Sequence, residues 1–206
     1  YQDELRNKKP AGIHWLQAGS TALFTGAEAK QIWTYRVPSW LGAALATLAC
    51  FWCGMPLIGR RASFVGAALF GTTLLLTSEA HISKTDGMLV FLTTLSIGAL
   101  ARLYMRGDQS KRMALLFWTA TGLVFLIKGP VGPMVAAYAG LGAWVWTRAA
   151  GGKGGDWWRV LLWWPGPAIF VALVLPWFLW IQAATGGEFI KGAVGKDLKD
   201  KFTGAS

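Results

Sequence analysis

The stretch SEAHISKTDGML, residues Ser78–Leu89, separates two long runs of sequence that contain no charged residue. The run before it is Ala62–Ser78, and the run after it is Gly87–Ala101. Uncharged runs that alternate with short charged stretches are typical of helices that cross a membrane. Within eight positions this stretch carries four ionisable side chains, Glu79, His81, Lys84 and Asp86.

The composition also indicates a membrane protein. The chain is 54% apolar and 15% charged, whereas a soluble domain carries about 25% charged residues. Its net charge of +10 does not indicate a nucleic-acid partner, because such a protein would not have uncharged runs this long. Cys50 and Cys53 form a C-x-x-C pair inside one apolar run, and a metal site needs more N or S ligands than these two. We therefore predict an all-α polytopic protein with the lipid bilayer as a partner and no metal site at these cysteines.

Six segments are predicted to span the membrane. Some are shorter than the roughly 20 residues that a span requires, so either polar neighbours extend them or one or two enter the membrane only in part. We expect residues 1–37 to form a periplasmic loop with short interfacial helices, residues 38–182 a transmembrane bundle, and residues 183–206 a second periplasmic loop. The six segments are Pro38–Ile58, Ala62–Ser78, Gly87–Ala101, Met113–Ile127, Val131–Thr147 and Val160–Gln182.

The loops between these segments predict the orientation. Gly59–Arg61, Arg102–Arg112 and Arg148–Arg159 lie on one side and carry nine Lys or Arg and two acids, a net charge of +7. By the positive-inside tendency this side is cytoplasmic, which places the Ser78–Leu89 stretch in the periplasm, outside the bacterial inner membrane. Tryptophans near the span ends are predicted to mark the two membrane interfaces, and Trp157 and Trp177 are among them.

Asp86 is the candidate catalytic residue. A carboxylate at a membrane surface can accept a proton or position a cation. If the third span starts near Ile82, then Glu79, Ser83 and Asp86 share one side of a helix. The alternative is that Asp86 only caps the helix or pairs with Lys84.

Basic residues gather on the same predicted face. Lys128 lies in the turn FLIKGPVGP, where it either binds a lipid phosphate or extends toward the headgroups without a specific role. The segment RNKKPAGIHWLQ, residues Arg6–Gln17, begins an amphipathic stretch that runs to about Ala27. That stretch is either an interfacial helix or a solvated basic loop before an ordinary helix. Arg36 adds a cation at the mouth of the first span.

These charges suit a reaction on a lipid-linked phosphate. Lys and Arg stabilise the phosphate that departs from a polyprenyl-phosphate sugar. A carboxylate takes the proton of an acceptor hydroxyl, unless the acceptor is itself a phosphate. The sequence has no metal-ligand pattern, glycine-rich phosphate loop or nucleophile elbow, which argues against a nucleotide-driven pump and serine hydrolase chemistry.

The order of the motifs resembles bacterial glycosyltransferase family 83, the aminoarabinose-transferase-like relatives of protein O-mannosyltransferases. This resemblance implies a GT-C fold with periplasmic helices in the first large loop. It also implies an undecaprenyl-phosphate sugar donor and a lipid or glycan acceptor in the periplasm, such as lipid A or lipopolysaccharide core. The motifs are RNKKPAGIHWLQA, YRVPSWLGA, EAHISKTDGML, FLIKGPVGP and FIKGAVGKDLKDKF.

The resemblance carries over to particular residues. Asp86 matches the family's second acidic position, Lys9 the basic residue before proline, and Lys128 the lysine of the later turn. Lys8 stands where the aminoarabinose transferases have Glu. This difference argues against a metal site that uses the Glu, and it weakens the inference that the sugar is aminoarabinose. A divalent cation is the only cofactor left open. The family's leading carboxylate is expected upstream of Tyr1, so we expect the 206-residue chain alone to be inactive.

The leading hypothesis is therefore an integral-membrane glycosyltransferase that uses a polyprenyl-phosphate sugar. The alternatives are a transporter or flippase of a lipid-linked anion, and a non-catalytic scaffold. A transporter would place charges within the spans and would have discontinuous helices at mid-membrane. In the leading hypothesis Asp86 orients a substrate or assists the upstream carboxylate. The candidate phosphate-binding residues are Lys9, Arg36, Lys84 and Lys128, and the further site candidates are Glu79, His81 and Lys8.

Overall fold

The computed structural model describes residues 10–26, 31–82, 84–106, 110–150 and 156–186. Every regular element in these ranges is a helix, which confirms the predicted all-α fold. The elements are α1 (Gly12–Phe24), α2 (Ile32–Ile58), α3 (Arg60–Gly71), α4 (Leu74–Ala80), α5 (Asp86–Arg106), α6 (Lys111–Lys128), α7 (Val131–Ala149), the 3-10 helix η1 (Asp156–Leu162) and α8 (Pro165–Ala184).

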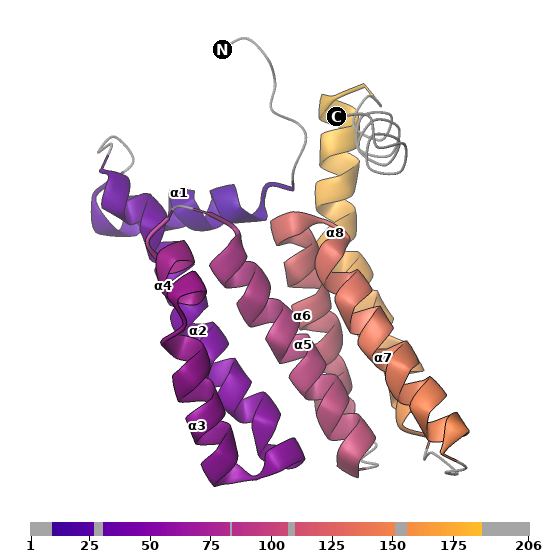
Figure 1. Ribbon diagram of the computed structural model, residues 1–206. Helices are drawn as coiled ribbons and strands as arrows, with labels where there is room; N and C mark the ends of the chain where they lie inside the picture. Colours follow the sequence, from indigo (N-terminus) through magenta and orange to yellow (C-terminus); the bar gives the residue numbers. More distant parts are fainter. Residues whose placement is uncertain (1–9, 27–30, 83, 107–109, 151–155, 187–206) are drawn as a thin grey trace, which may run out of the picture.

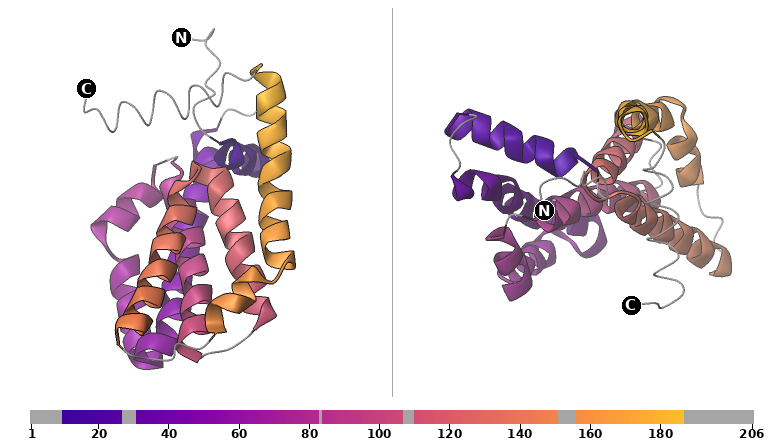
Figure 2. Two further views of the ribbon diagram at one scale, coloured as in Figure 1. Left: turned by 90° about the vertical axis from the view of Figure 1, so that its right-hand side faces the viewer. Right: turned by 90° about the horizontal axis from the view of Figure 1, so that it is seen from above.

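The long helices stand side by side and run alternately up and down, while α1 lies across one end of them (Figure 1). We call the end that carries α1 the upper end. The connection from α4 to α5 and the turn from α6 to α7 also lie there. We call the opposite end, with the turn from α2 to α3, the lower end. Figure 2, seen from above, shows α1 lying flat over the bundle.

Three of the described helices are long and apolar enough to cross a membrane: α2, α5 over Asp86–Met105, and α8. The consecutive helices α3 and α4 meet at an angle of 57° and would make a fourth span if they count as one. Their break falls at Thr72 and Thr73, whose hydroxyls donate to the carbonyls of Ala68 and Phe70 in the preceding turn. The predicted number of six spans stays a prediction.

The helix α5 begins at Asp86, one residue before the predicted span Gly87–Ala101, so the alternative helix start near Ile82 is not found. The start of the last helix differs more from the sequence-based expectation. The last span was expected from Val160, but Asp156–Leu162 forms the 3-10 helix and α8 begins at Pro165, because proline is favoured in the first turn of a helix.

The helices α2 and α5 approach each other closely, backbone against backbone. A Cβ atom added to Gly42 of α2 would lie 2.5 Å from the backbone N of Met88, and one added to Gly87 of α5 would lie 2.5 Å from the carbonyl O of Ser39. Ala46, on the same face of α2, is fully buried. Small residues let two membrane helices pack backbone against backbone, and this contact fixes α5 on α2.

Two tryptophans assigned to the membrane interfaces are instead part of the core, each with only 4% of its surface exposed. Trp157 packs edge-on against the ring of Tyr104, with the ring centroids 5.7 Å apart. Trp177 packs with Leu126 and Ile181. Both rings fill space between helices and do not face the headgroups, and the depth predicted for them at the two interfaces stays a prediction.

Large apolar side chains cover the outside of the bundle. Leu48 of α2, Leu69 of α3 and Leu179 of α8 expose more than half of their surface. Water would make such a surface unfavourable, whereas lipid chains match it. The fold is therefore an all-helical membrane bundle.

Candidate functional site

The start of α5 is held in place by a serine of α2. The hydroxyl of Ser39 donates a hydrogen bond to the carbonyl of Lys84 (2.8 Å) and accepts one from the N–H of Lys84 (3.2 Å). Ser39 is fully buried, and Gly87 packs on its carbonyl. Both backbone groups of Lys84 are thus engaged outside a helix, which explains why α5 begins at Asp86 rather than near Ile82.

The end of α6 is equally well defined. Gly129 closes the helix in the left-handed region, with φ of +72°, and its N–H donates to the carbonyl of Phe125 at 2.7 Å. The next helix begins at Val131. This short turn leaves Lys128, the last residue of α6, at the upper end of the bundle.

These two helix ends bring Asp86 and Lys128 together as an ion pair, in which the ammonium of Lys128 donates to Oδ1 of Asp86. Each charge also suits its helix, because a carboxylate is favoured at a helix N-terminus and a cation at a C-terminus. The side chains of Asp86 and Lys128 are 32% and 35% exposed. The pair is therefore anchored by the bundle and still open to an anionic ligand.

A second ion pair forms nearby in the sequence. Lys84 Nζ lies 3.2 Å from Oε1 of Glu79, so Lys84 pairs with Glu79 and not with Asp86. Oε2 of Glu79 is shielded and has no hydrogen-bond partner among the described residues. His81 is exposed, and its Nδ1 lies 2.7 Å from the carbonyl of Thr77, which can only accept. Nδ1 therefore carries the proton of the neutral ring.

The helix α1 packs against the turn that carries Lys128. A Cβ added to Gly12 would lie 2.5 Å from the carbonyl O of Leu126, and one added to Gly129 would lie 3.9 Å from Cγ of Pro10. Pro10 directly follows Lys9 in the sequence, just as Gly129 directly follows Lys128. Lys8 and Lys9 themselves lie outside the described residues.

Three buried hydroxyls join α1 to the start of α2. Ser20 donates to the carbonyl of Thr34 at 2.8 Å, and the hydroxyls of Thr21 and Thr34 lie 3.2 Å apart. The crosswise position of α1 is thus fixed by hydrogen bonds as well as by apolar contacts. The predicted amphipathic stretch after Pro10 forms this helix.

The structure joins four of the predicted site residues into two ion pairs and leaves two others outside them. Arg36 is exposed near the start of α2, and within the described ranges no ion pair includes it or His81. Sequence reasoning missed Ser39, which positions the residues before Asp86. Its signal was a small polar residue within an apolar span, in YRVPSWLGA.

The described residues contain no group of three His, Cys, Asp or Glu side chains placed to hold a metal ion. Among the described residues, the upper end offers two carboxylates, Asp86 and Glu79, and each is engaged by a lysine. Its polar chemistry is therefore that of paired cations and carboxylates above an apolar bundle.

The fold and these pairs define a class: a membrane-embedded helical protein with a polar site at one end of its helices. The chain belongs to the dolichyl-phosphate-mannose-protein mannosyltransferase family, which matches residues 8–180. Among curated relatives, it is 27% identical over 179 residues to undecaprenyl phosphate-alpha-4-amino-4-deoxy-L-arabinose arabinosyl transferase 2 of Pseudomonas fluorescens. That alignment covers 84% of this chain and 30% of the relative.

Two solved structures share the fold. ArnT from Cupriavidus metallidurans in the apo state matches with a TM-score of 0.74 and 22% identity. ArnT from the same organism bound to undecaprenyl phosphate matches with a TM-score of 0.72 and 23% identity. In both cases the match covers 91% of this chain and 34% of ArnT, so the chain spans about a third of the length of these relatives.

Proposed function

We propose that the whole protein is a glycosyltransferase that moves a sugar from a polyprenyl-phosphate donor to a periplasmic acceptor such as lipid A or lipopolysaccharide core. The observation that carries this proposal is the Asp86–Lys128 ion pair at the upper end, in a chain of the mannosyltransferase family. Support for the donor comes from the curated relative, named for an undecaprenyl-phosphate sugar, and from the related structure with undecaprenyl phosphate bound.

The pair fits an inverting displacement. The acceptor oxygen forms a bond to the anomeric carbon, and the bond from that carbon to the phosphate oxygen breaks. The polyprenyl phosphate leaves with the electron pair, and the proton of an acceptor hydroxyl passes to a carboxylate. Lys128 stabilises the negative charge on the leaving phosphate. Asp86 holds the Lys128 ammonium in place before the phosphate arrives.

The other predicted residues take supporting roles at the same end. Lys84 and Arg36 are candidates to hold the phosphate, and Lys9 is a third, because its neighbour Pro10 lies beside the turn after Lys128. The basic connections at the lower end support a periplasmic upper end and a multi-pass topology in the inner membrane.

The test is mass spectrometry of envelope glycolipids from cells that lack the full-length gene. These cells are complemented with the wild type, Asp86→Asn or Lys128→Met. Loss of the sugar mass in the null strain should be reversed by the wild type. We expect Lys128→Met to lower transfer by about 10²–10³-fold, as for loss of one group that stabilises charge in a transition state. Asp86→Asn should lower it in the same direction.

Lys111→Met is the matched control, because Lys111 begins the same helix at the lower end and lies over the ring of Trp163. It should retain transfer at equal expression. If the null strain has an unchanged glycolipid profile and the protein instead moves a lipid-linked anion across vesicles, the transporter hypothesis replaces this one.

A further inference from the structure

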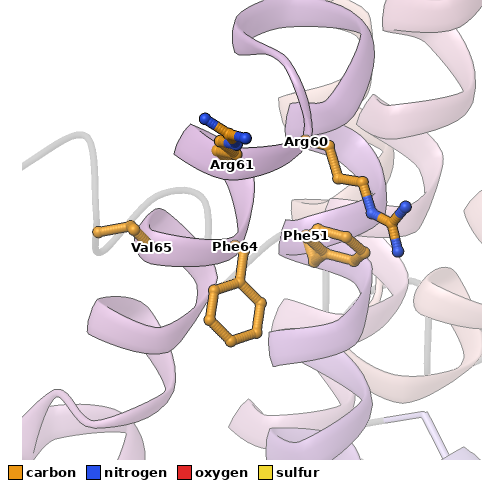
Figure 3. A pocket seen from close by; sticks show the side chains of 5 residues that line it. All are labelled: Phe51, Arg60, Arg61, Phe64 and Val65. Carbon is orange, nitrogen blue, oxygen red and sulfur yellow. The ribbon is translucent and has the colours of Figure 1, made fainter.

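The lower end of the bundle has a groove between α2 and α3. Its volume is about 710 Å³, and it is open to the outside. Figure 3 shows the side chains that line it, Phe51 from α2 and Arg60, Arg61, Phe64 and Val65 from α3. This groove lies at the opposite end from Asp86 and Lys128, so the proposed transfer reaction does not use it.

The two arginines make the mouth of the groove strongly positive. Arg60 and Arg61 are exposed, and neither of the two ion pairs found in the described ranges includes them. Arg102, which donates a hydrogen bond to the carbonyl of Trp52 on α2, adds a third cation at this end. A guanidinium binds a phosphate through two parallel hydrogen bonds, so the mouth suits a phosphate group.

The walls of the groove are apolar and lie deeper along the helices. Phe64 follows Arg60 by four residues, which places it about 6 Å further along α3. The ring of Phe64 meets that of Phe51 edge-on, with the centroids 6.4 Å apart. Further along the same two helices, Leu48 and Leu69 are 63% and 66% exposed. A ligand that fits has an anionic head and an apolar tail.

We propose that this groove binds one anionic phospholipid, with its phosphate on Arg60 and Arg61 and an acyl chain along Phe51 and Phe64. The positive-inside tendency assigns this end to the cytoplasmic leaflet, which is where such a lipid would reach it. The lipid fills a surface that the helices leave uncovered, and it anchors the turn between α2 and α3.

The test uses the purified full-length protein and native mass spectrometry, with titration of dioleoylphosphatidylglycerol against dioleoylphosphatidylethanolamine. We expect one tightly bound phosphatidylglycerol on the wild type and roughly tenfold weaker binding for Arg60→Gln/Arg61→Gln. Val65→Trp fills the groove without changing the charge, and it should also weaken binding. Arg148→Gln/Arg159→Gln removes two cations elsewhere at the lower end and is the matched control.

Three outcomes would overturn the proposal. The wild type could show no preference for phosphatidylglycerol, as it would if another part of the full-length protein occupies the groove. The control double variant could lose as much binding as Arg60→Gln/Arg61→Gln, which would indicate a general effect of charge. Val65→Trp could bind like the wild type, which would place the lipid outside the groove.

Discussion

The cations at the two ends of the bundle contact different kinds of side chain. At the upper end, Lys128 and Lys84 are paired with carboxylates. At the lower end, four cations lie over tryptophan rings, at distances of 4.1–5.8 Å from the ring centroid. These pairs are Arg102 with Trp52, Lys111 with Trp163, Arg148 with Trp144, and Arg159 with Trp158.

This difference separates chemistry from anchoring. A tryptophan face steadies a cation at a membrane surface and carries no formal negative charge itself, which suits contact with lipid headgroups. A carboxylate fixes the position of the ammonium and also brings a group that can accept a proton or hydrogen bond. In the proposed function, the upper end therefore supplies groups for the reaction, and the lower end supplies groups for attachment.

The largest effect is expected from the contact that fixes the upper end. Gly87→Val would place a side chain against the carbonyl of Ser39 and push α5 away from α2. We expect a loss of stability of about 3 kcal/mol and low accumulation of the protein. Gly66→Val is the control, because a Cβ at Gly66 meets open space. Thermal unfolding of the two full-length variants in detergent checks this, and equal stability would contradict it.

Ser39→Ala should have the next largest effect. It removes two hydrogen bonds to the backbone of Lys84. The N–H of Lys84 keeps its bond to the carbonyl of Ile82 at 2.8 Å, whereas the carbonyl of Lys84 loses the partner that Ser39 supplies, at a cost of about 1–3 kcal/mol. It also loosens the start of α5, so we expect sugar transfer to fall about tenfold. Ser78→Ala is a matched control, because the hydroxyl of Ser78 donates to the carbonyl of Leu75 within its own helix α4. Glycolipid analysis that finds full transfer in Ser39→Ala would contradict the role given to Ser39.

A double-mutant cycle measures the Asp86–Lys128 pair itself. Because about a third of each side chain is exposed, we expect a coupling free energy of about 0.5–1 kcal/mol between Asp86→Asn and Lys128→Gln. The cycle for Glu79→Gln and Lys84→Gln should give less, because Lys84 is 49% exposed. Thermal unfolding of the single and double variants measures both coupling free energies. A larger value for Glu79–Lys84 than for Asp86–Lys128 would contradict this prediction.

The smallest effect on sugar transfer should come from the lower end. Arg102→Gln removes a guanidinium that lies 4.1 Å from the centroid of the Trp52 ring and donates to the carbonyl of Trp52, at a cost in stability of about 1–2 kcal/mol. Sugar transfer should be unchanged, because Arg102 lies far along α5 from Asp86. A strong loss of transfer at equal expression would show that the two ends are not functionally separate.

The sequence predicted the helices well, because charge-free runs bounded by charged loops have few other physical solutions in a membrane. It also selected Asp86 and Lys128 as separate candidates. It could not pair them, because they are 42 positions apart and their meeting depends on how α5 packs against α6. Lys84, which is nearer to Asp86 in the sequence, was the partner considered for it, and Lys84 pairs with Glu79 instead. Likewise, Trp157 and Trp177 lie near span ends in the sequence, and only the packing shows that they face inward.

The close contact between α2 and α5 has a consequence for how the protein is made. The helices α2 and α5 pack against each other, yet residues 59–85 lie between them in the sequence and leave the ribosome before α5 does. At about 5–20 residues per second, α2 waits some seconds in the membrane before α5 arrives. Its partner face is lined by Gly42, Ala46 and Ala49, small residues that lipid chains cover without cost. The face of α2 that later holds α5, and with it Asp86, can therefore remain exposed to lipid until α5 is inserted. A larger residue at Gly42 would prevent α5 from packing there.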